Sequence, residues 1–151
     1  MRVLFVCLGN ICRSPLAEGV LKHLVSERGL SERYEIDSAG TCAHHIGQEA
    51  DPRSQAVANP PGVTLTSRGR KVSPSDFVEF DLIVPMDDEN LSTLRRECPA
   101  EHRDKIRLMR SWDPDGEGDV PDPYYGGPRG FDLIYEMIDR SCEALLDEFK
   151  T

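Results

Sequence analysis

Apolar residues along the chain fall either into short continuous runs or into longer stretches with helical spacing. The first run, RVLFVC at residues 2–7, is almost entirely apolar and contains β-branched and aromatic residues. Such a run is typical of a strand that is buried on both faces of a parallel sheet. After a polar loop, Ser14-Pro15 predicts the start of a helix, and apolar residues then recur at helical spacing until Gly29. This part of the chain therefore predicts a strand, a loop and a helix.

The same order returns along the rest of the chain. We expect further strands at residues 34–38, 81–86 and 105–109, and further helices at residues 51–57, 88–98 and 131–149. The last helix has one continuous apolar stripe, whereas residues 111–130 before it are rich in Asp, Gly and Pro and indicate a loop. Strands that alternate with helices predict an α/β fold, in which a parallel sheet is covered on both faces.

Length, charge and cysteine content narrow the class of protein. With 151 residues, one domain over residues 1–151 can bury roughly 70 % of its unfolded surface. The formal charge of -9 argues against nucleic acid or an anionic membrane as the main partner. No stretch approaches the roughly 18 apolar residues of a membrane helix, and no signal peptide is evident, so we expect a cytoplasmic protein. The five cysteines lack framework spacing and fit a reduced chain.

The loop between the first strand and the first helix, CLGNICRS at residues 7–14, has the features of an anion-binding site. Backbone N–H groups converge at such a position, and the helix dipole favours negative charge there. Gly9 and Asn10 tolerate left-handed backbone, and the planar guanidinium of Arg13 can hold two oxygens of a tetrahedral anion. The expected phosphate-binding residues are Leu8, Gly9, Asn10, Ile11, Cys12, Arg13 and Ser14.

Cys7 ends the strand that leads into this loop, so the field that attracts an anion should also favour its thiolate. An unperturbed cysteine is only about 3 % ionised at pH 7, and helix N-termini or cationic neighbours raise that fraction. Ser14 is placed to donate its hydroxyl to the sulfur. A cysteine followed by Arg six positions later is a weak pattern by itself. The alternative interpretation is a buried structural Cys7 and a surface Arg13.

Four stretches of the chain resemble the low molecular weight protein tyrosine phosphatases. The signature is VCLGNICRSPLAE at residues 6–18, and the resemblance extends through DSAGT at 37–41, MDDENL at 86–91 and DPYYGG at 122–127. It implies a single domain with a four-stranded parallel sheet and a phosphate-binding loop after the first strand. It also implies a cysteine-dependent phosphatase that hydrolyses phosphotyrosine and small aryl phosphates through a cysteinyl-phosphate, with no metal or other cofactor.

A general acid is required as well, because the leaving oxygen of a phosphomonoester has to be protonated. Composition alone does not identify this acid, since the loop after residue 111 contains five carboxylates: Asp113, Asp115, Glu117, Asp119 and Asp122. The resemblance selects Asp122, the first residue of DPYY. It thus implies Cys7 as nucleophile, Arg13 as the residue that holds the phosphate, and Asp122 as the acid.

The resemblance assigns further roles around the loop. His44, Tyr124 and Tyr125 form the substrate rim, Ser38 braces the loop together with Asn10, and Cys7 and Cys12 form a reversible disulfide. Plainer interpretations remain for each: the tyrosines pack in a Gly-rich turn, Cys12 is a small buried side chain, and Ser38 belongs to a turn. His44 and His45 are adjacent and would point to opposite faces of an extended chain, which makes a metal site there unfavourable.

The expected substrates are tyrosine-phosphorylated proteins, with a cognate tyrosine kinase as a candidate partner and a monomeric state. Ile11 and the pair Tyr124-Tyr125 favour phosphotyrosine as the substrate. In related enzymes that act on phosphoarginine, the residue at the position of Ile11 resembles threonine. Two alternatives use the same scaffold, a protein-arginine phosphatase and an arsenate reductase. The second needs a relay of further cysteines, which Cys98 and Cys142 do not resemble. A non-catalytic phosphoprotein-binding module is the third alternative, because it needs the loop but no acid.

Overall fold

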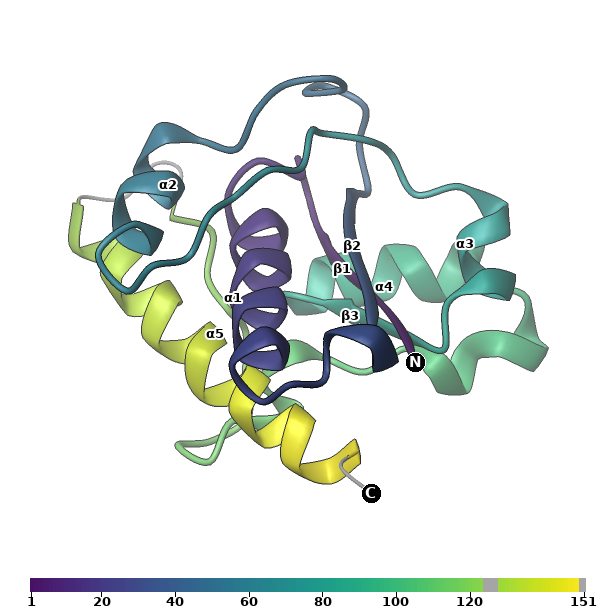
Figure 1. Cartoon of the computed structure of the whole chain (residues 1–151). Helices are drawn as coiled ribbons and strands as arrows, with labels where there is room; N and C mark the ends of the chain where they lie inside the picture. Colours follow the sequence, from purple (N-terminus) through teal and green to yellow (C-terminus); the bar gives the residue numbers. More distant parts are fainter. Residues whose placement is uncertain (124–127, 150–151) are drawn as a thin grey trace.

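Three parallel strands form the central sheet (Figure 1). The structure is a computed structural model that describes residues 1–123 and 128–149. Strand β1 (Arg2–Cys7) lies between β2 (Glu35–Gly40) and β3 (Leu82–Pro85), and Cys7 pairs in register with Gly40. The central position of β1 confirms the prediction from its apolar run, because residues 3–7 are all buried.

Helices cover both faces of the sheet, as the alternation of elements predicted. They are α1 (Arg13–Glu27), α2 (Pro52–Ala58), α3 (Pro74–Glu79), α4 (Asp88–Glu97) and α5 (Pro128–Phe149), with 3-10 helices η1 (Ser31–Arg33), η2 (Ala100–Lys105) and η3 (Met109–Trp112). Figure 1 shows α1 and α5 on one side of the strands and α3 and α4 on the other. The chain forms a single α/β domain.

Alternate side chains of β1 enter two separate hydrophobic cores. Val3 and Phe5 pack with apolar residues of α1 and α5, whereas Leu4 and Val6 pack with Phe77 and other residues of the opposite layer. A strand whose two faces are both buried is held firmly in position. The carboxyl end of β1, where Cys7 lies, is therefore a rigid support for a site.

The predicted strand at residues 105–109 is wrong, since the described sheet has three strands rather than four. Pro99 precedes the 3-10 helix η2, which occupies the chain up to Lys105, and η3 begins again at Met109. Only Ile106 reaches the sheet, where it forms an isolated parallel bridge to Ile83. The extended segment between the two helices is too short to build a ladder.

Helix α3 was not among the predicted elements, although its start has a clear sequence signal. Ser73 and Asp76 form a capping box, and Pro74 occupies the first turn. The helix is short, which explains why apolar periodicity did not reveal it. No helix among the described residues is long and apolar enough to span a membrane.

Candidate active site

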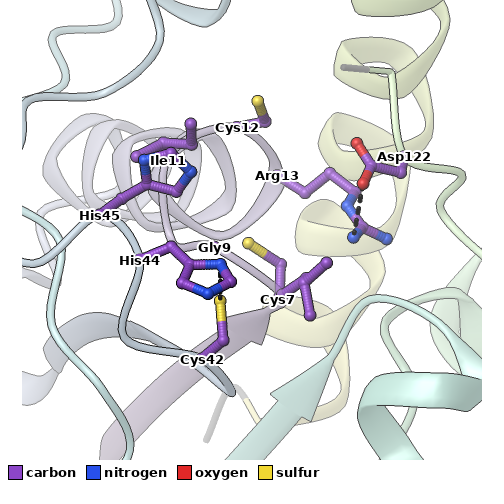
Figure 2. Close-up of a pocket in the computed structure, with 10 residues that line it drawn as sticks. Cys7, Gly9, Ile11, Cys12, Arg13, Cys42, His44, His45 and Asp122 are labelled. Atoms are coloured by element: carbon purple, nitrogen blue, oxygen red, sulfur yellow. Dashed lines mark hydrogen bonds and ion pairs between the residues drawn. The ribbon is translucent and has the colours of Figure 1, made fainter. Parts of the chain in front are cut away.

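A pocket of about 350 Å³ lies beyond the carboxyl end of β1 (Figure 2). Its lining residues come from the loop after β1, from the segment after β2 and from the segment before α5: Cys7, Leu8, Gly9, Ile11, Cys12, Arg13, Cys42, His44, His45 and Asp122. The ends of parallel strands are where α/β folds bind ligands. Residues 7–14 are called the phosphate-binding loop below.

The sulfur of Cys7 has a hydroxyl beside it. Cys7 is 2 % exposed, and its Sγ lies 3.0 Å from the Oγ of the fully buried Ser14. The amide nitrogen of Asn10 donates to the same Oγ at 2.9 Å, so the Ser14 proton remains available for the sulfur. The competing acceptor, the carbonyl of Ala39, is farther away at 3.4 Å. Ser14 can therefore donate a hydrogen bond to the Cys7 sulfur.

Asn10 holds the phosphate-binding loop in shape from inside. Its φ of 56° places it in the left-handed region, which Asn tolerates better than most residues. Its Nδ2 donates to Ser14 and, at 3.0 Å, to the Oγ of Ser38, while its Oδ1 accepts from the backbone N–H of Arg70 at 2.9 Å. Ser38 in turn donates to the buried Glu18 at 2.5 Å. Ser38 therefore links Asn10 of the loop to Glu18 of α1.

Gly40 is a site residue that the sequence did not reveal. A Cβ at this position would lie 2.9 Å from the carbonyl oxygen of Leu8, which leaves no room for a side chain. The next two residues bond to the loop, since Thr41 N–H donates to the Cys7 carbonyl and Cys42 N–H to the Leu8 carbonyl. The end of β2 is therefore fastened to the start of the phosphate-binding loop. The only available signal was the glycine in DSAGT.

The backbone of the loop offers several donors to the pocket. Within the described part of the chain, the N–H groups of residues 8–12 donate to no protein acceptor. Unpaired donors at a strand end before a helix form a nest for an anion. The loop can therefore bind the oxygens of a phosphate group.

Arg13 adds a buried positive charge. It is 2 % exposed, and its Nη1 donates to Asp87 at 2.6 Å and to the Val120 carbonyl at 2.9 Å. Burial alone would lower the pKa of Arg13, but the charges of Cys7, Asp87 and Asp122 outweigh it and raise that pKa. Its Nε is buried and has no hydrogen-bond partner among the described residues. A buried donor of this kind requires a ligand acceptor or water.

Asp87 is a second residue whose role the sequence did not reveal. It caps α4 by accepting from the backbone N–H of Asn90 at 2.8 Å, and its other oxygen holds Arg13. One carboxylate therefore fixes both the helix start and the direction of the guanidinium. The motif MDDENL pointed to this region, but no role followed from it.

Asp122 is the only one of the five acidic candidates that lines the pocket. Its side chain is 41 % exposed, and its Oδ2 lies 3.8 Å from Nη2 of Arg13. Asp113, by contrast, is completely buried between Arg110 and Arg140. Burial opposes its ionisation, but hydrogen bonds from Arg140 and others lower the pKa of Asp113 to about 2. Tyr124 and Tyr125 lie outside the described residues.

Cys12 also lines the pocket, but its surroundings oppose ionisation. Burial, followed by the charge of Asp51, raises the pKa of Cys12 to about 12. Its Sγ lies 3.9 Å from Oδ2 of Asp51, which also caps α2. The two thiols of the loop therefore lie in different environments, one beside Ser14 and the other beside a carboxylate.

The side of the pocket across from Asp122 is formed by Cys42, His44 and His45, called the pocket wall (Figure 2). Residues 41–47 form bends and turns rather than the extended chain that the sequence argument assumed, and both histidines line the pocket. His45 packs tightly, since a Cβ on Gly69 would lie 2.1 Å from the His45 carbonyl oxygen. No group of three metal-binding side chains occurs among the described residues.

Two further cysteines lie away from the pocket. Cys98 belongs to the core under α3 and α4, and Cys142 lies in the core formed by α1 and α5. Burial raises the pKa of both thiols. Neither lines the pocket around Cys7, so these two cysteines lend no support to the arsenate reductase alternative.

Comparisons with known proteins identify the family of the chain. Residues 2–151 match the family model described as low molecular weight phosphotyrosine protein phosphatase. The low molecular weight protein-tyrosine-phosphatase of Streptomyces coelicolor is 48 % identical over 150 residues, which cover 96 % of this chain and 91 % of that protein. A crystal structure of a protein tyrosine phosphatase from Entamoeba histolytica, with Hepes in the active site, superposes with a TM-score of 0.95 at 44 % identity, covering 98 % of this chain and 96 % of the other. The Drosophila arginine phosphatase DARP superposes with a TM-score of 0.92 at 38 % identity, covering 100 % and 99 %.

Proposed function

Since the chain belongs to the low molecular weight phosphotyrosine protein phosphatase family and is a cysteine-dependent protein tyrosine phosphatase, we propose that Cys7 is its nucleophile, Arg13 its phosphate-binding cation and Asp122 its general acid. The observation that supports this most is the unpartnered, buried Nε of Arg13. Arg13 lines the pocket, and the unpaired N–H groups belong to the loop that lines the same pocket. Together these donors match the oxygens of a phosphate held in front of the Cys7 sulfur.

In the first step the Cys7 thiolate attacks phosphorus from the side opposite the leaving oxygen. Charge on the three equatorial oxygens is stabilised by the loop amides and by Arg13, which are already oriented in the protein. Asp122 gives its proton to the departing phenol oxygen. A cysteinyl-phosphate forms, and the carboxylate of Asp122 is left ionised.

In the second step a water molecule attacks the cysteinyl-phosphate. Asp122 accepts a proton from this water, and the sulfur of Cys7 leaves as a thiolate. The hydroxyl of Ser14, 3.0 Å from that sulfur, stabilises the leaving group as well as the resting nucleophile. Inorganic phosphate then leaves, and the starting state is restored.

Tyrosine-phosphorylated proteins are the substrates that we propose, with a cognate tyrosine kinase as partner, a cytoplasmic location and a monomeric state. The family supports phosphotyrosine as the substrate. The burial of Cys7 supports it too, because an aromatic phosphoester is long enough to reach a nucleophile at the end of a buried strand. Tyr124 and Tyr125 are proposed to flank the ring next to Asp122. Cys7 and Cys12 line one pocket and are proposed to form a reversible disulfide that protects the nucleophile.

Hydrolysis of p-nitrophenyl phosphate in the presence of EDTA tests the assignment of residues. We expect turnover by the wild type, loss of turnover in Cys7→Ser and a reduced kcat in Asp122→Asn. Full activity of Cys7→Ser would overturn the proposal. Peptides that contain phosphotyrosine, phosphoserine or phosphoarginine are compared side by side. The last is included because the Drosophila neighbour is an arginine phosphatase, and faster cleavage of it would identify that activity instead.

A further inference from the structure

Cys42 differs from every other cysteine of the chain in its exposure. Cys7, Cys12, Cys98 and Cys142 are all buried, whereas Cys42 is partly exposed. It also lines the same pocket as Cys7 and Arg13. Cys42 has no part in the catalytic steps described above. It is nevertheless the thiol that a small molecule in the pocket can reach with least obstruction.

A proton acceptor lies next to this thiol. The Sγ of Cys42 is 3.7 Å from Nδ1 of His44, which is exposed. The backbone of Cys42 is held against the phosphate-binding loop, because its N–H donates to the Leu8 carbonyl at 3.0 Å. The thiol therefore stays at the edge of the pocket, and Nδ1 is placed to accept its proton when the sulfur reacts.

The pocket also offers hydrogen-bond donors that suit an anion, and these donors select the kind of molecule that reaches Cys42. The Nε of Arg13 is buried and unpartnered within the described residues, and the N–H groups of residues 8–12 are unpaired there too. Carboxylates bind to the same donors as phosphate. In the view of Figure 2, Cys7 lies between Cys42 and Arg13. A small molecule that binds Arg13 through a carboxylate can thus extend along the pocket towards Cys42.

From this arrangement we propose that Cys42 is a modification site, which forms a mixed disulfide with small disulfides that contain a carboxylate. The proton of the Cys42 thiol passes to Nδ1 of His44, and the sulfur attacks one sulfur of the reagent. A new S–S bond forms while the S–S bond of the reagent breaks, and the departing thiolate takes the proton from the imidazolium. Cys42 is oxidised, and half of the disulfide is reduced to a thiol.

The modification blocks the active site reversibly. A group attached to Cys42 occupies part of a pocket of about 350 Å³, so a phosphoester can no longer enter fully. A thiol reductant restores the free pocket. The inference rests on the proposed function, because the anion-binding donors that select the modifier are those assigned to phosphate.

Labelling of the Cys7→Ser variant tests the site without interference from the nucleophile. The protein is treated with 3,3′-dithiodipropionate, which is anionic, or with cystamine, which is cationic. Each rate at Cys42 is divided by the rate of the same reagent with 2-mercaptoethanol. Trypsin releases residues 34–53 with Cys42 as their single cysteine, so mass spectrometry counts the modified fraction.

We expect the normalised rate to be about tenfold higher for the anionic reagent, because local positive potential concentrates anions. A net charge of -9 predicts the opposite order for an ordinary exposed thiol. Inorganic phosphate should slow the anionic reagent and leave the cationic one unchanged. Equal rates, a faster reaction of cystamine, or no label on residues 34–53 would overturn the proposal.

Phosphate binding by the modified protein provides the second measurement. Calorimetry should show at least about tenfold weaker phosphate binding after modification of Cys7→Ser, with recovery after dithiothreitol. The double variant with Cys42→Ser is the matched control and should bind phosphate with or without the reagent. Unchanged binding after modification would contradict the inference alone. Failure of the unmodified Cys7→Ser protein to bind phosphate would instead contradict the proposed function.

Discussion

The base and the mouth of the pocket are built in different ways. At the base, Cys7, Asn10, Arg13 and Ser14 are each at most 2 % exposed and are held by hydrogen bonds from several elements. At the mouth, Leu8 is 44 % exposed, Asp122 is 41 % exposed and His44 is exposed. The base is therefore fixed before substrate arrives, whereas the mouth has room to adjust.

The base and the mouth should therefore affect different steps, the base the chemical reaction and the mouth substrate binding. Preorganised donors stabilise charge in the transition state because they do not have to reorient during the reaction. Residues at the mouth contact the parts of the substrate that do not react, so they affect binding and selectivity. Substitutions at the base should therefore lower kcat strongly, whereas substitutions in the pocket wall should mainly change KM.

The largest effect is expected for Cys7→Ser. Serine is a far weaker nucleophile than a thiolate at neutral pH, so kcat/KM should fall by at least about 10⁴-fold. The substitution nearly preserves volume and the contact with Ser14, so thermal unfolding should change little. Steady-state kinetics and calorimetry measure both. Cys42→Ser, in the pocket wall, serves as the control and should keep its kcat on p-nitrophenyl phosphate.

Asp122→Asn should have the next largest effect, although the residue lies at the mouth. Loss of the acid should lower kcat about 10² to 10³-fold. The loss should be greater for phenyl phosphate than for p-nitrophenyl phosphate, because nitrophenolate leaves more easily without a proton. Glu117→Gln, an exposed carboxylate of the same loop, is the control. Equal losses on the two substrates would show that Asp122 is not the acid.

Ser14→Ala should have an intermediate effect. It removes the hydroxyl that lies 3.0 Å from the Cys7 sulfur, and a hydrogen bond to a charged group contributes about 1.5 to 3 kcal/mol. We expect kcat to fall about tenfold or more, and iodoacetamide to label residues 3–13 more slowly at neutral pH. Ser26→Ala in the exposed part of α1 is the control. Unchanged labelling would mean that the hydroxyl does not stabilise the thiolate.

Cys12 predicts a pH dependence of stability. Burial and Asp51 raise its pKa from 9.0 to about 12 in the folded state. The stabilisation from the neutral thiol is complete below pH 9 and is lost as the pH rises through about 12. Between these values the wild type should lose about 1 kcal/mol per pH unit more than Cys12→Ala. Denaturant unfolding at a series of pH values measures the difference, and parallel pH profiles would contradict the assignment.

His44→Tyr should have the smallest effect. The side chain belongs to the pocket wall and is exposed, so we expect about a threefold change in KM for phosphotyrosine peptides and an unchanged kcat. Kinetics with peptides that differ around the phosphotyrosine measure the change. A large loss of kcat would show that the pocket wall takes part in the chemistry. It would also remove the distinction between the base and the mouth of the pocket.

Local sequence was sufficient for the parts of the site that lie close together in the chain. The apolar run before Cys7 predicted the central strand, and the residues from Cys7 to Ser14 predicted the loop that leads from this strand into a helix, because each depends on neighbouring residues. Asp87 and Arg70 were missed because their roles arise from contacts with residues 74 and 60 positions away. Their sequence surroundings contain no sign of those partners.

The fourth strand shows the same limit in the fold. The residues around Ile106 have suitable β-propensity, but a strand needs a continuous ladder to a neighbour, and here only one bridge forms. Helix η2 occupies the residues up to Lys105, and η3 begins at Met109. Competition between adjacent elements therefore decided the outcome, rather than the propensity of the segment itself.

The central claim is that the sulfur of Cys7 attacks phosphorus. The direct measurement is a rapid mixing experiment with a ³²P-labelled phosphotyrosine peptide, stopped within the first turnover in alkaline detergent. Trypsin releases residues 3–13, which contain both Cys7 and Cys12, and fragmentation locates the label. The account predicts a phosphorylated Cys7 that appears before phosphate release. Turnover without a labelled peptide, or with the label on Cys12 or outside residues 3–13, would contradict it.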